Sequence, residues 1–150
     1  MAILQMARIE DSFIWYRIRN LPSVRMASFD PSPINYEGHL KWFAKKLEDP
    51  NSILMLITQE SSVVGQVRIE EQEGETVISI ALMPEARGLG IGKKALKECV
   101  KFIMKTKLSK NIAAYIKPGN IASINAFEAA GLHFDRETTV NNLVALKFVR

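Results

Sequence analysis

A glycine-rich turn between a β-type segment and a helical segment is the feature that most limits how this chain folds. Residues 76–83 (TVISIALM) are rich in β-branched side chains and apolar at successive positions, which is typical of a strand covered on both faces. Gly88, Gly90 and Gly92 follow, and pairs of apolar residues then recur every four positions over residues 95–104, which predicts a helix. A central strand that leads directly into a long helix favours a layered fold in which the helix packs on the sheet.

The rest of the chain supplies the other elements of one mixed sheet. Besides residues 76–83, we expect strands over residues 2–9, 53–59, 63–71, 111–117, 132–138 and 143–149. We expect further helices over residues 11–20, 36–48 and 121–130, with Asp11 and Asn35 as N-caps and Gly131 at the C′ position. The chain has 150 residues and no linker, repeat or low-complexity tract, so residues 1–150 are predicted to form a single domain. The predicted fold class is mixed α/β (α+β), with a central twisted sheet flanked by helices.

Composition excludes several classes of protein. Cys99 is the only cysteine and His39 and His133 are the only histidines, so neither a disulfide framework nor a closed zinc site is available, and no metal is expected. The N-terminal segment lacks the unbroken apolar core of a signal peptide, and no apolar stretch approaches the roughly 20 residues of a membrane helix. We therefore expect a cytoplasmic protein with no membrane partner. A net charge of +4 suits an anionic ligand but is too small to indicate nucleic-acid binding.

The turn over residues 83–94 (MPEARGLGIGKK) predicts an anion site. Glycines let a ligand approach the backbone, and the free N–H groups and dipole at a helix N-terminus attract phosphate. A nucleotide-binding P-loop requires GxxxxGK followed by Ser or Thr, whereas Lys94 follows Gly92-Lys93 here. A dinucleotide fingerprint requires GxGxxG early in a parallel unit and an acidic residue after the next strand, whereas Pro118 follows residues 111–117 here. Both nucleotide patterns are therefore absent.

The remaining pattern, Arg87-Gly88-Leu89-Gly90-Ile91-Gly92, resembles the coenzyme A loop of the GNAT superfamily of acetyl-CoA dependent N-acetyltransferases. Residues 120–132 (NIASINAFEAAGL) resemble a second element of that superfamily, a helix of the form N, two residues, A or S, a hydrophobic residue, then Y or F, then GF. The two segments occur in the family's order, and the expected elements agree with the family from about residue 53 to the end. The resemblance implies a GNAT-like fold and an acyltransferase that uses acetyl-CoA.

The resemblance also implies which residues bind the coenzyme. Main-chain groups at the end of the central strand are implied to bond the pantetheine arm as an added strand, and the loop amides are implied to hold the pyrophosphate. The helix after residue 120 is implied to line the other side of the arm. The implied cofactor-binding residues are Ile80, Ala81, Leu82, Arg87, Gly88, Leu89, Gly90, Ile91, Gly92, Lys93, Asn120, Ser123 and Phe127.

The usual acid and base of the family are missing from this chain. Phe127 stands where a Tyr is often the general acid, and Val77 stands where a Glu on the fourth strand is often the base. Either the amine loses its proton through water or another side chain substitutes, and the candidate catalytic residues are then Glu70 and His39. The ordinary histidine pKa of about 6.5 suits a base. Glu70 also fits a solvated strand end, and His39 also fits a hydrogen-bonded structural histidine.

The N-terminal half resembles, more loosely, a GNAT subgroup that acetylates nucleotide-linked amino sugars. The shared pattern is Arg19-Asn20, Val24-Arg25 and then His39 and Trp42, with Ile18 in place of the subgroup's tryptophan. Each matching residue also fits a structural ion pair or a core aromatic. The implied substrate-binding residues are Arg19, Asn20, Arg25, Trp42 and Arg68.

The predicted function is transfer of an acetyl group from acetyl-CoA to a primary amine, with a nucleotide-linked amino sugar as the candidate acceptor. The alternatives are a protein or small-amine acetyltransferase and a non-catalytic acyl-CoA-binding module. The lysines spaced by four over residues 93–105 fit a solvated helix face, and Cys99, in the apolar register of that helix, fits a buried thiol. We expect a monomer or homodimer that binds no nucleic acid.

Overall fold

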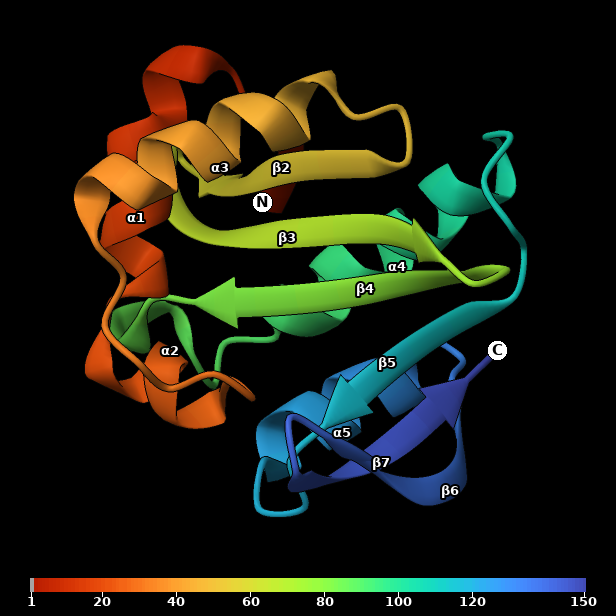
Figure 1. Cartoon of the computed structure of the whole chain (residues 1–150). Helices are drawn as coiled ribbons and strands as arrows, with labels where there is room; N and C mark the ends of the chain where they lie inside the picture. Colours follow the sequence, from red (N-terminus) through yellow and green to blue (C-terminus); the bar gives the residue numbers. More distant parts are fainter. Residues whose placement is uncertain (1) are drawn as a thin grey trace.

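The computed structural model describes residues 2–150 and shows a mixed sheet with helices on both faces (Figure 1). The strand order is β1-β2-β3-β4-β5-β7-β6. The strands are β1 (Ala2–Met6), β2 (Ser52–Gln59), β3 (Ser62–Gln72), β4 (Glu75–Leu82), β5 (Ile112–Ile116), β6 (His133–Val140) and β7 (Leu143–Val149). The α-helices are α1 (Ser12–Arg19), α2 (Pro22–Ala27), α3 (Tyr36–Glu48), α4 (Ile91–Met104) and α5 (Ile121–Ala129), and two 3-10 turns are η1 (Ile9–Asp11) and η2 (Pro84–Ala86).

The sheet is split where β4 meets β5. The pairs β1–β2, β2–β3 and β3–β4 are antiparallel, and so are the pairs β5–β7 and β7–β6. β4 and β5 are parallel and pair only at Thr76 with Ile112 and at Val77 with Ala113. Beyond these pairs Figure 1 shows the two strands diverging toward their arrowheads. The carboxyl ends of β4 and β5 therefore border a gap, which we call the strand gap.

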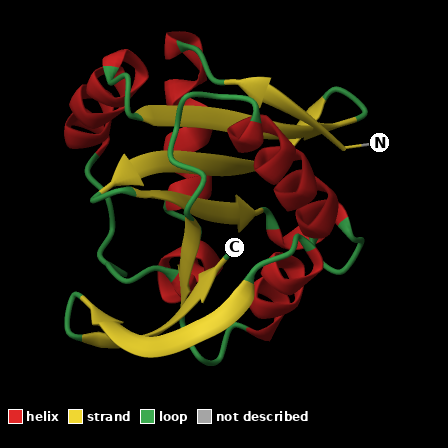
Figure 2. Cartoon of the chain, turned by 90° about the vertical axis from the view of Figure 1, so that its right-hand side faces the viewer, coloured by secondary structure: helices red, strands yellow, loops and turns green. Residues whose placement is uncertain are grey.

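Figure 2 shows helices on both faces of the sheet, and each face carries a different core. On one face Ile69 and Ile78 pack with Leu96, Cys99 and Ile103 of α4, and the same cluster continues under α5. On the other face Leu54 and Leu56 of β2 pack with Trp15 of α1 and Phe43 of α3. Each face thus buries its own apolar set, as a strand periodicity of two requires. Among residues 2–150, no helix is both long and apolar enough to cross a bilayer.

The elements predicted from the sequence are confirmed apart from their ends. Each predicted strand and helix has a counterpart in the structure. Asn35 caps α3 as predicted, since its Oδ1 accepts a hydrogen bond from Gly38 N at 3.0 Å. Gly131 follows α5 with φ of +99°, the left-handed conformation expected at C′. Cys99 is fully buried, as its place in the apolar register predicts.

Three details of the sequence prediction are wrong. The first strand ends at Met6 and not near residue 9, and α2, which begins at Pro22, was not predicted. β4 is only partly covered on the face that carries α1, because α1 contacts this strand but leaves Ser79 exposed. Asp11 is the N-cap of α1 as predicted, although its carboxylate accepts from Arg8 N at 2.8 Å and makes no hydrogen bond to the helix.

Candidate active site

The strand gap leaves main-chain groups of β4 without a partner strand. Successive residues of a strand direct their N–H and C=O groups alternately to its two sides. Met83 N donates to Val64 O of the β3 segment at 2.9 Å, so the odd-numbered residues of β4 face β3. On the other side, Thr76 N donates to Asn111 O at 2.8 Å. The main-chain groups that face the gap are therefore the carbonyl of Ile78 and both groups of Ile80 and Leu82, because the pair of Val77 with Ala113 engages the N–H of Ile78.

This alternation places Ile80 and Leu82 as the resemblance implied, but not Ala81. Ala81 pairs with Gln66 of β3, and its carbonyl oxygen lies 2.6 Å from where a Cβ on Gly65 would stand. Its main chain is thus turned away from the gap. The carbonyl of Leu82 already accepts a hydrogen bond from Arg87 Nη2 at 2.9 Å. Ile80 therefore keeps the most accessible pair of main-chain groups along this edge.

The glycine-rich loop brings the N-terminus of α4 to the end of β4. Gly88 and Gly90 have φ of +76° and +78°, where side chains are strained, although a Cβ at either would meet nothing within 4 Å. Glycine is needed at these positions for the backbone and not to avoid crowding within the chain. Gly92 lies at a close junction, since a Cβ there would be in van der Waals contact with Leu82 Cδ1 at 3.4 Å and with Ala126 Cβ at 3.9 Å. Strand β4 and helices α4 and α5 meet at this residue.

The first turn of α4 presents free N–H groups beside the gap. Gly90 is the N-cap and supplies no side-chain cap, and the first intrahelical bond runs from Lys94 N to Gly90 O at 3.2 Å. The N–H groups of Ile91, Gly92 and Lys93 therefore have no acceptor within the helix. The helix dipole adds partial positive charge at the same place. This turn can bind an anion of phosphate type next to the strand gap.

Other residues implied to bind the coenzyme are anchored within the protein. Arg87 Nη2 donates to Ser23 Oγ and to Leu82 O, both at 2.9 Å, so Arg87 fastens α2 to the loop. Asn120 is the N-cap of α5, and its Oδ1 accepts from Ser123 N at 3.2 Å. Phe127 is 3% exposed and lies in the cluster shared by α4 and α5. Its ring packs in the core and does not form an open wall of the gap, which corrects the sequence prediction.

A cavity of about 270 Å³ lies on the face of the sheet that carries α1 and α3. Arg68 of β3 lies opposite Ser79 of β4, so the two side chains share this face. The cavity therefore lies over β3, the strand next to β4. We call it the arginine cavity, and its lining residues are Arg19, Ile34, Asn35, Gly38, His39, Trp42 and Arg68.

Two guanidinium groups give the arginine cavity its charge. Arg19 Nη2 donates to Ser28 Oγ at 3.0 Å, whereas Nη1 is buried without a hydrogen-bond partner among residues 2–150. Burial, and then the charge of Arg68, lowers the pKa of Arg19, so the two guanidinium groups lie close enough to repel each other. Arg68 stacks over the ring of Trp42 with 5.7 Å between its Cζ and the ring centroid. A buried guanidinium N–H without a partner is a donor suited to an anionic ligand.

Glu70 neutralises part of this charge. Its Oε2 lies 2.5 Å from Lys46 Nζ, its Oε1 lies 2.8 Å from Arg68 Nε, and its side chain is 13% exposed. Glu70 also lies opposite Val77, one strand away from the position where the resemblance expects a glutamate. Both carboxylate oxygens thus lie beside a cation, but only Lys46 donates a hydrogen bond to Glu70, because Arg68 Nε has no hydrogen-bond partner among residues 2–150.

His39 is buried at the wall of the arginine cavity. It is 2% exposed, and its Nε2 lies 2.9 Å from Ser12 O. Since a carbonyl oxygen only accepts, Nε2 carries the proton and Nδ1 is the basic nitrogen. Burial lowers the pKa of His39, and the bond to Ser12 opposes this shift, so the ring is neutral near pH 7. The neighbouring rings, with centroids between 5.5 and 6.4 Å away, are Tyr16, Tyr36, Trp42 and Phe43.

The structure does not bring every implied substrate residue to the cavity. The side chain of Asn20 binds the main chain of Ile34, donating from Nδ2 to O at 3.1 Å and accepting from N at 2.8 Å. It therefore holds the loop before α3 in place. Arg25 lies outside the cavity lining, and its Nε is buried without a partner in the described part of the chain.

Sequence reasoning missed three lining residues, Ile34, Asn35 and Gly38. Asn35 was recognised only as a helix cap. No spacing in the sequence shows that the first turn of α3 faces Arg68, because that contact depends on how α3 crosses β3. Cavity lining from this loop is set by tertiary packing.

Comparison with known proteins agrees with this geometry. A family model for the acetyltransferase (GNAT) domain matches residues 2–133. No curated protein sequence matches the chain.

Solved structures share the fold at low sequence identity. An aminoglycoside acetyltransferase in complex with coenzyme A has a TM-score of 0.85 and 14% identity, over 100% of this chain and 94% of that one. The ribosomal-protein-alanine N-acetyltransferase from Brucella melitensis has a TM-score of 0.83 and 19% identity, over 99% of this chain and 98% of that one. The spermidine N-acetyltransferase from Vibrio cholerae, in complex with CoA and spermine, has a TM-score of 0.84 and 13% identity, over 99% of this chain and 93% of that one. At these identities the likeness is one of fold.

Proposed function

The chain belongs to the GNAT acetyltransferase family, and we propose that it transfers an acetyl group from acetyl-CoA to the primary amine of an anionic acceptor. We infer an anionic acceptor from the pair of guanidinium groups in the arginine cavity. The coenzyme assignment is supported by the strand gap and by the loop before α4. A nucleotide-linked amino sugar, which the N-terminal motifs favour, is an acceptor of this class.

The residues at the strand gap fit acetyl-CoA. The carbonyl of Ile78 and the main-chain groups of Ile80 are positioned for an extended amide chain, and the free N–H groups of Ile91 to Lys93 for a diphosphate. Around Gly88 and Gly90 the space that a Cβ would enter is open, which leaves room for a ligand close to the backbone. Acetyl-CoA, when bound, supplies the acetyl group as a thioester, and coenzyme A leaves as the thiol.

The charge of the arginine cavity indicates which charge the acceptor carries. Arg19, Arg68 and the nearby Lys46 face a single interior carboxylate, Glu70, which is already paired. A polycationic amine would be repelled there, whereas a carboxylate or phosphate would satisfy the buried Nη1 of Arg19. The acceptor proposed here therefore differs in charge from aminoglycosides and spermine.

His39 is the better candidate for the base. Its Nδ1 is basic and its ring is neutral near pH 7, as a group that accepts a proton from an ammonium must be. Glu70 is hydrogen-bonded to Lys46 and forms an ion pair with Arg68, whereas Nδ1 of His39 has no cation bonded to it within residues 2–150. In this proposal Glu70 holds Arg68 in place, and His39 receives the proton directly or through water.

The size of the cavity favours a second candidate acceptor, a small amine that carries a carboxylate. Pockets for drug-sized ligands occupy about 300–1,000 Å³. A cavity of about 270 Å³ holds an amino-acid-sized molecule, but only one end of a nucleotide-linked sugar. A non-catalytic acyl-CoA-binding module is the remaining alternative, since Phe127 and Val77 replace the family's usual acid and base.

Isothermal titration with acetyl-CoA, with NADH and ATP as controls, tests the coenzyme assignment. We expect micromolar binding of acetyl-CoA and no comparable binding of the controls. Absence of acetyl-CoA binding would contradict the assignment of the loop.

An acceptor panel tests the rest. Coenzyme A release is followed with a thiol reagent, and Cys99 adds no background because it is fully buried and burial raises its pKa to about 12. The matched pair is a UDP-linked 4-amino sugar against the same amino sugar without the nucleotide, with small amino acids and spermine beside them. We expect turnover of the anionic amines only. Preference for spermine would contradict the proposed acceptor class, and binding without any turnover would favour the non-catalytic module.

A further inference from the structure

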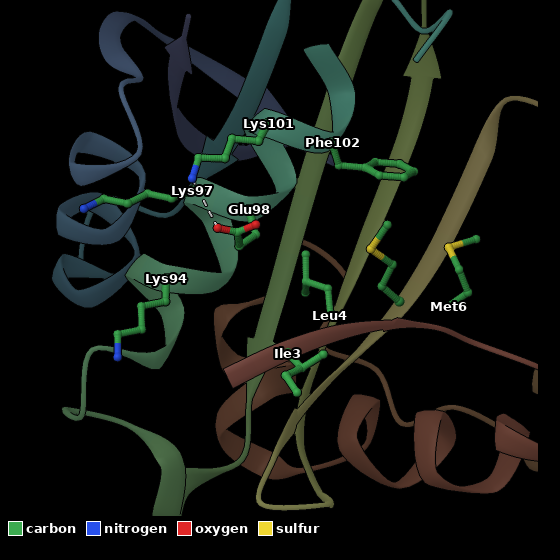
Figure 3. Close-up of a pocket in the computed structure, with 9 residues that line it drawn as sticks. Ile3, Leu4, Met6, Lys94, Lys97, Glu98, Lys101 and Phe102 are labelled. Atoms are coloured by element: carbon green, nitrogen blue, oxygen red, sulfur yellow. Dashed lines mark hydrogen bonds and ion pairs between the residues drawn. The ribbon is translucent and has the colours of Figure 1, made fainter. Parts of the chain in front are cut away.

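A second hollow lies at the edge of the sheet, away from the strand gap and the arginine cavity. It is a groove of about 660 Å³ between β1 and α4, which we call the β1–α4 groove (Figure 3). Its floor is apolar and one wall is charged. The lining residues are Ile3, Leu4, Met6, Met55, Lys94, Lys97, Glu98, Lys101 and Phe102.

The groove borders an open strand edge. β1 is the first strand of the sheet and pairs only with β2 among residues 2–150. Ala7 N donates to Leu54 O at 2.9 Å, so in this register the main-chain groups of Ile3 and Gln5 face β2. The N–H and C=O groups of Leu4 and Met6 therefore point outward. These are residues whose side chains line the groove.

The apolar part of the groove is unusually exposed for a strand edge. Ile3 is 58% and Met6 is 54% exposed. Natural proteins usually protect such an edge because its free main-chain groups and apolar side chains pair readily with another extended chain. Here the residues beside the edge are lysines of α4, whose positive charge selects which chain can approach.

The charge of the α4 wall is positive. Lys101 Nζ lies 3.4 Å from Glu98 Oε1, while Lys94 and Lys97 extend from the helix into solvent (Figure 3). Three cations and one anion leave a net charge of about +2 along this wall. Two copies of the chain joined edge to edge through β1 would bring two such walls together, so charge disfavours a second copy as the occupant. An acidic strand would be attracted.

We propose that the β1–α4 groove binds an extended acidic segment of another protein, which adds a strand beside β1. Its main chain pairs with the outward groups of Leu4 and Met6, its apolar side chains cover Met6 and Phe102, and its carboxylates face Lys94, Lys97 and Lys101. The site is independent of acetyl transfer, since none of these residues belongs to the strand gap or the arginine cavity.

Peptide titration followed by NMR tests the proposal. The probes are the seven-residue peptide Val-Thr-Val-Thr-Glu-Thr-Glu, which in an extended chain carries its valines and glutamates on one face, and the matching peptide with lysine in place of glutamate. We expect saturable binding of the acidic peptide with a Kd tighter than about 1 mM, slower hydrogen exchange at the Leu4 and Met6 amides, and weakening by salt. Equal binding of the basic peptide, no saturable binding, or unchanged exchange at both amides would overturn the proposal.

Variants separate the charge contribution from the main-chain contribution. Lys97→Glu with Lys101→Glu should weaken acidic-peptide binding about tenfold or more, because two attractive pairs become repulsive. Lys41→Glu with Lys45→Glu on α3 is the matched control, with the same spacing and charge change on exposed positions of the other face. Equal weakening in both double variants would overturn the assignment to the groove.

Leu4→Pro removes one outward N–H and no bond to β2, a change that an edge strand tolerates. It should weaken binding more than Leu4→Ala, with folding of both variants checked by thermal unfolding. If the proline variant binds as well as the alanine variant, main-chain pairing is refuted. Sedimentation of the unliganded protein adds one more test, since self-association lost on Leu4→Pro would assign the edge to a second copy instead.

Discussion

Replacing Gly90 with alanine tests whether the backbone of the loop, and not only its charge, binds the coenzyme. Gly90 has φ of +78° and a Cβ there would meet nothing within 4 Å. An alanine at this φ is strained by about 1–2 kcal/mol. The loop can respond in two ways. It can keep the left-handed conformation, in which case the strain lowers the free energy of unfolding. It can instead leave that conformation, which turns the N–H groups of Ile91 to Lys93 away from the proposed coenzyme site.

The two responses have different consequences for binding. If the loop rearranges, acetyl-CoA must restore the original conformation, which weakens binding about 5- to 30-fold for 1–2 kcal/mol. If the loop keeps its conformation, the new methyl group stands in the open space over the free N–H groups, where the proposed diphosphate lies. Weaker binding is expected either way.

Two other glycines provide matched controls. Gly74 has φ of +82° with nothing within 4 Å of its Cβ, but it lies in the β3–β4 turn at the far end of β4. Gly74→Ala should lose about 1–2 kcal/mol in urea unfolding and keep its affinity for acetyl-CoA. Gly119 lacks both crowding and a positive φ, so Gly119→Ala should keep the affinity for acetyl-CoA and raise the free energy of unfolding by about 0.4–1 kcal/mol. If Gly90→Ala binds acetyl-CoA as tightly as the natural chain in isothermal titration, or if Gly74→Ala loses equal affinity, the loop assignment is refuted.

Four further predictions concern the arginine cavity and the second half of the sheet. Arg68→Ala should raise the KM for an anionic acceptor about tenfold or more and leave the KM for acetyl-CoA unchanged, with Arg68→Lys intermediate; a rise in both constants would indicate a general structural defect. In the natural chain, kcat/KM should fall as the pH drops below the lowered pKa of His39, because the protonated ring cannot act as a base. His39→Gln should lose this dependence on pH, and an unaltered pH profile would exclude His39 as the base. The natural chain should also lose stability in thermal unfolding as the pH falls below about 6.5, because its unfolded state takes up a proton that the buried ring of His39 resists, and His39→Gln should not. Glu75→Gln should lower the free energy of unfolding by about 1–3 kcal/mol, because Lys147, whose side chain is only 8% exposed, loses the carboxylate that lies 2.6 Å from its Nζ. Adding Lys147→Met should recover part of the loss, and no recovery would show that the pair is not coupled.

Most of the fold was predictable because its signals are local. Strand β4, the loop and α4 follow from a β-branched run, three glycines and a helical repeat within 29 consecutive residues, 76–104. Asn35 and Gly131 act at helix ends through their own side chain or backbone, so their roles were also readable. The prediction failed at Pro22, which was taken as the end of a helix but stands at the first position of α2, where proline is also common.

The conformation of the segment that we propose to bind the coenzyme was predictable for the same reason. The free N–H groups of α4 and the positive φ of Gly88 and Gly90 arise within one short segment. The exceptions are Ala81 and Phe127, whose assignments depended on which way a strand or a helix faces. One is turned toward β3 and the other into the core.

The sequence by itself determined the class of the fold, the anion-binding turn and the absence of the family's usual acid and base. Only the tertiary structure decided which side chains share the arginine cavity, that Glu70 is held by Lys46 and Arg68, and that His39 presents Nδ1 as its basic nitrogen. The physical reason is distance along the chain. A turn or a helix cap is set by residues a few positions apart, whereas the cavity joins Arg19, His39 and Arg68, which meet only when helices α1 and α3 pack across the sheet.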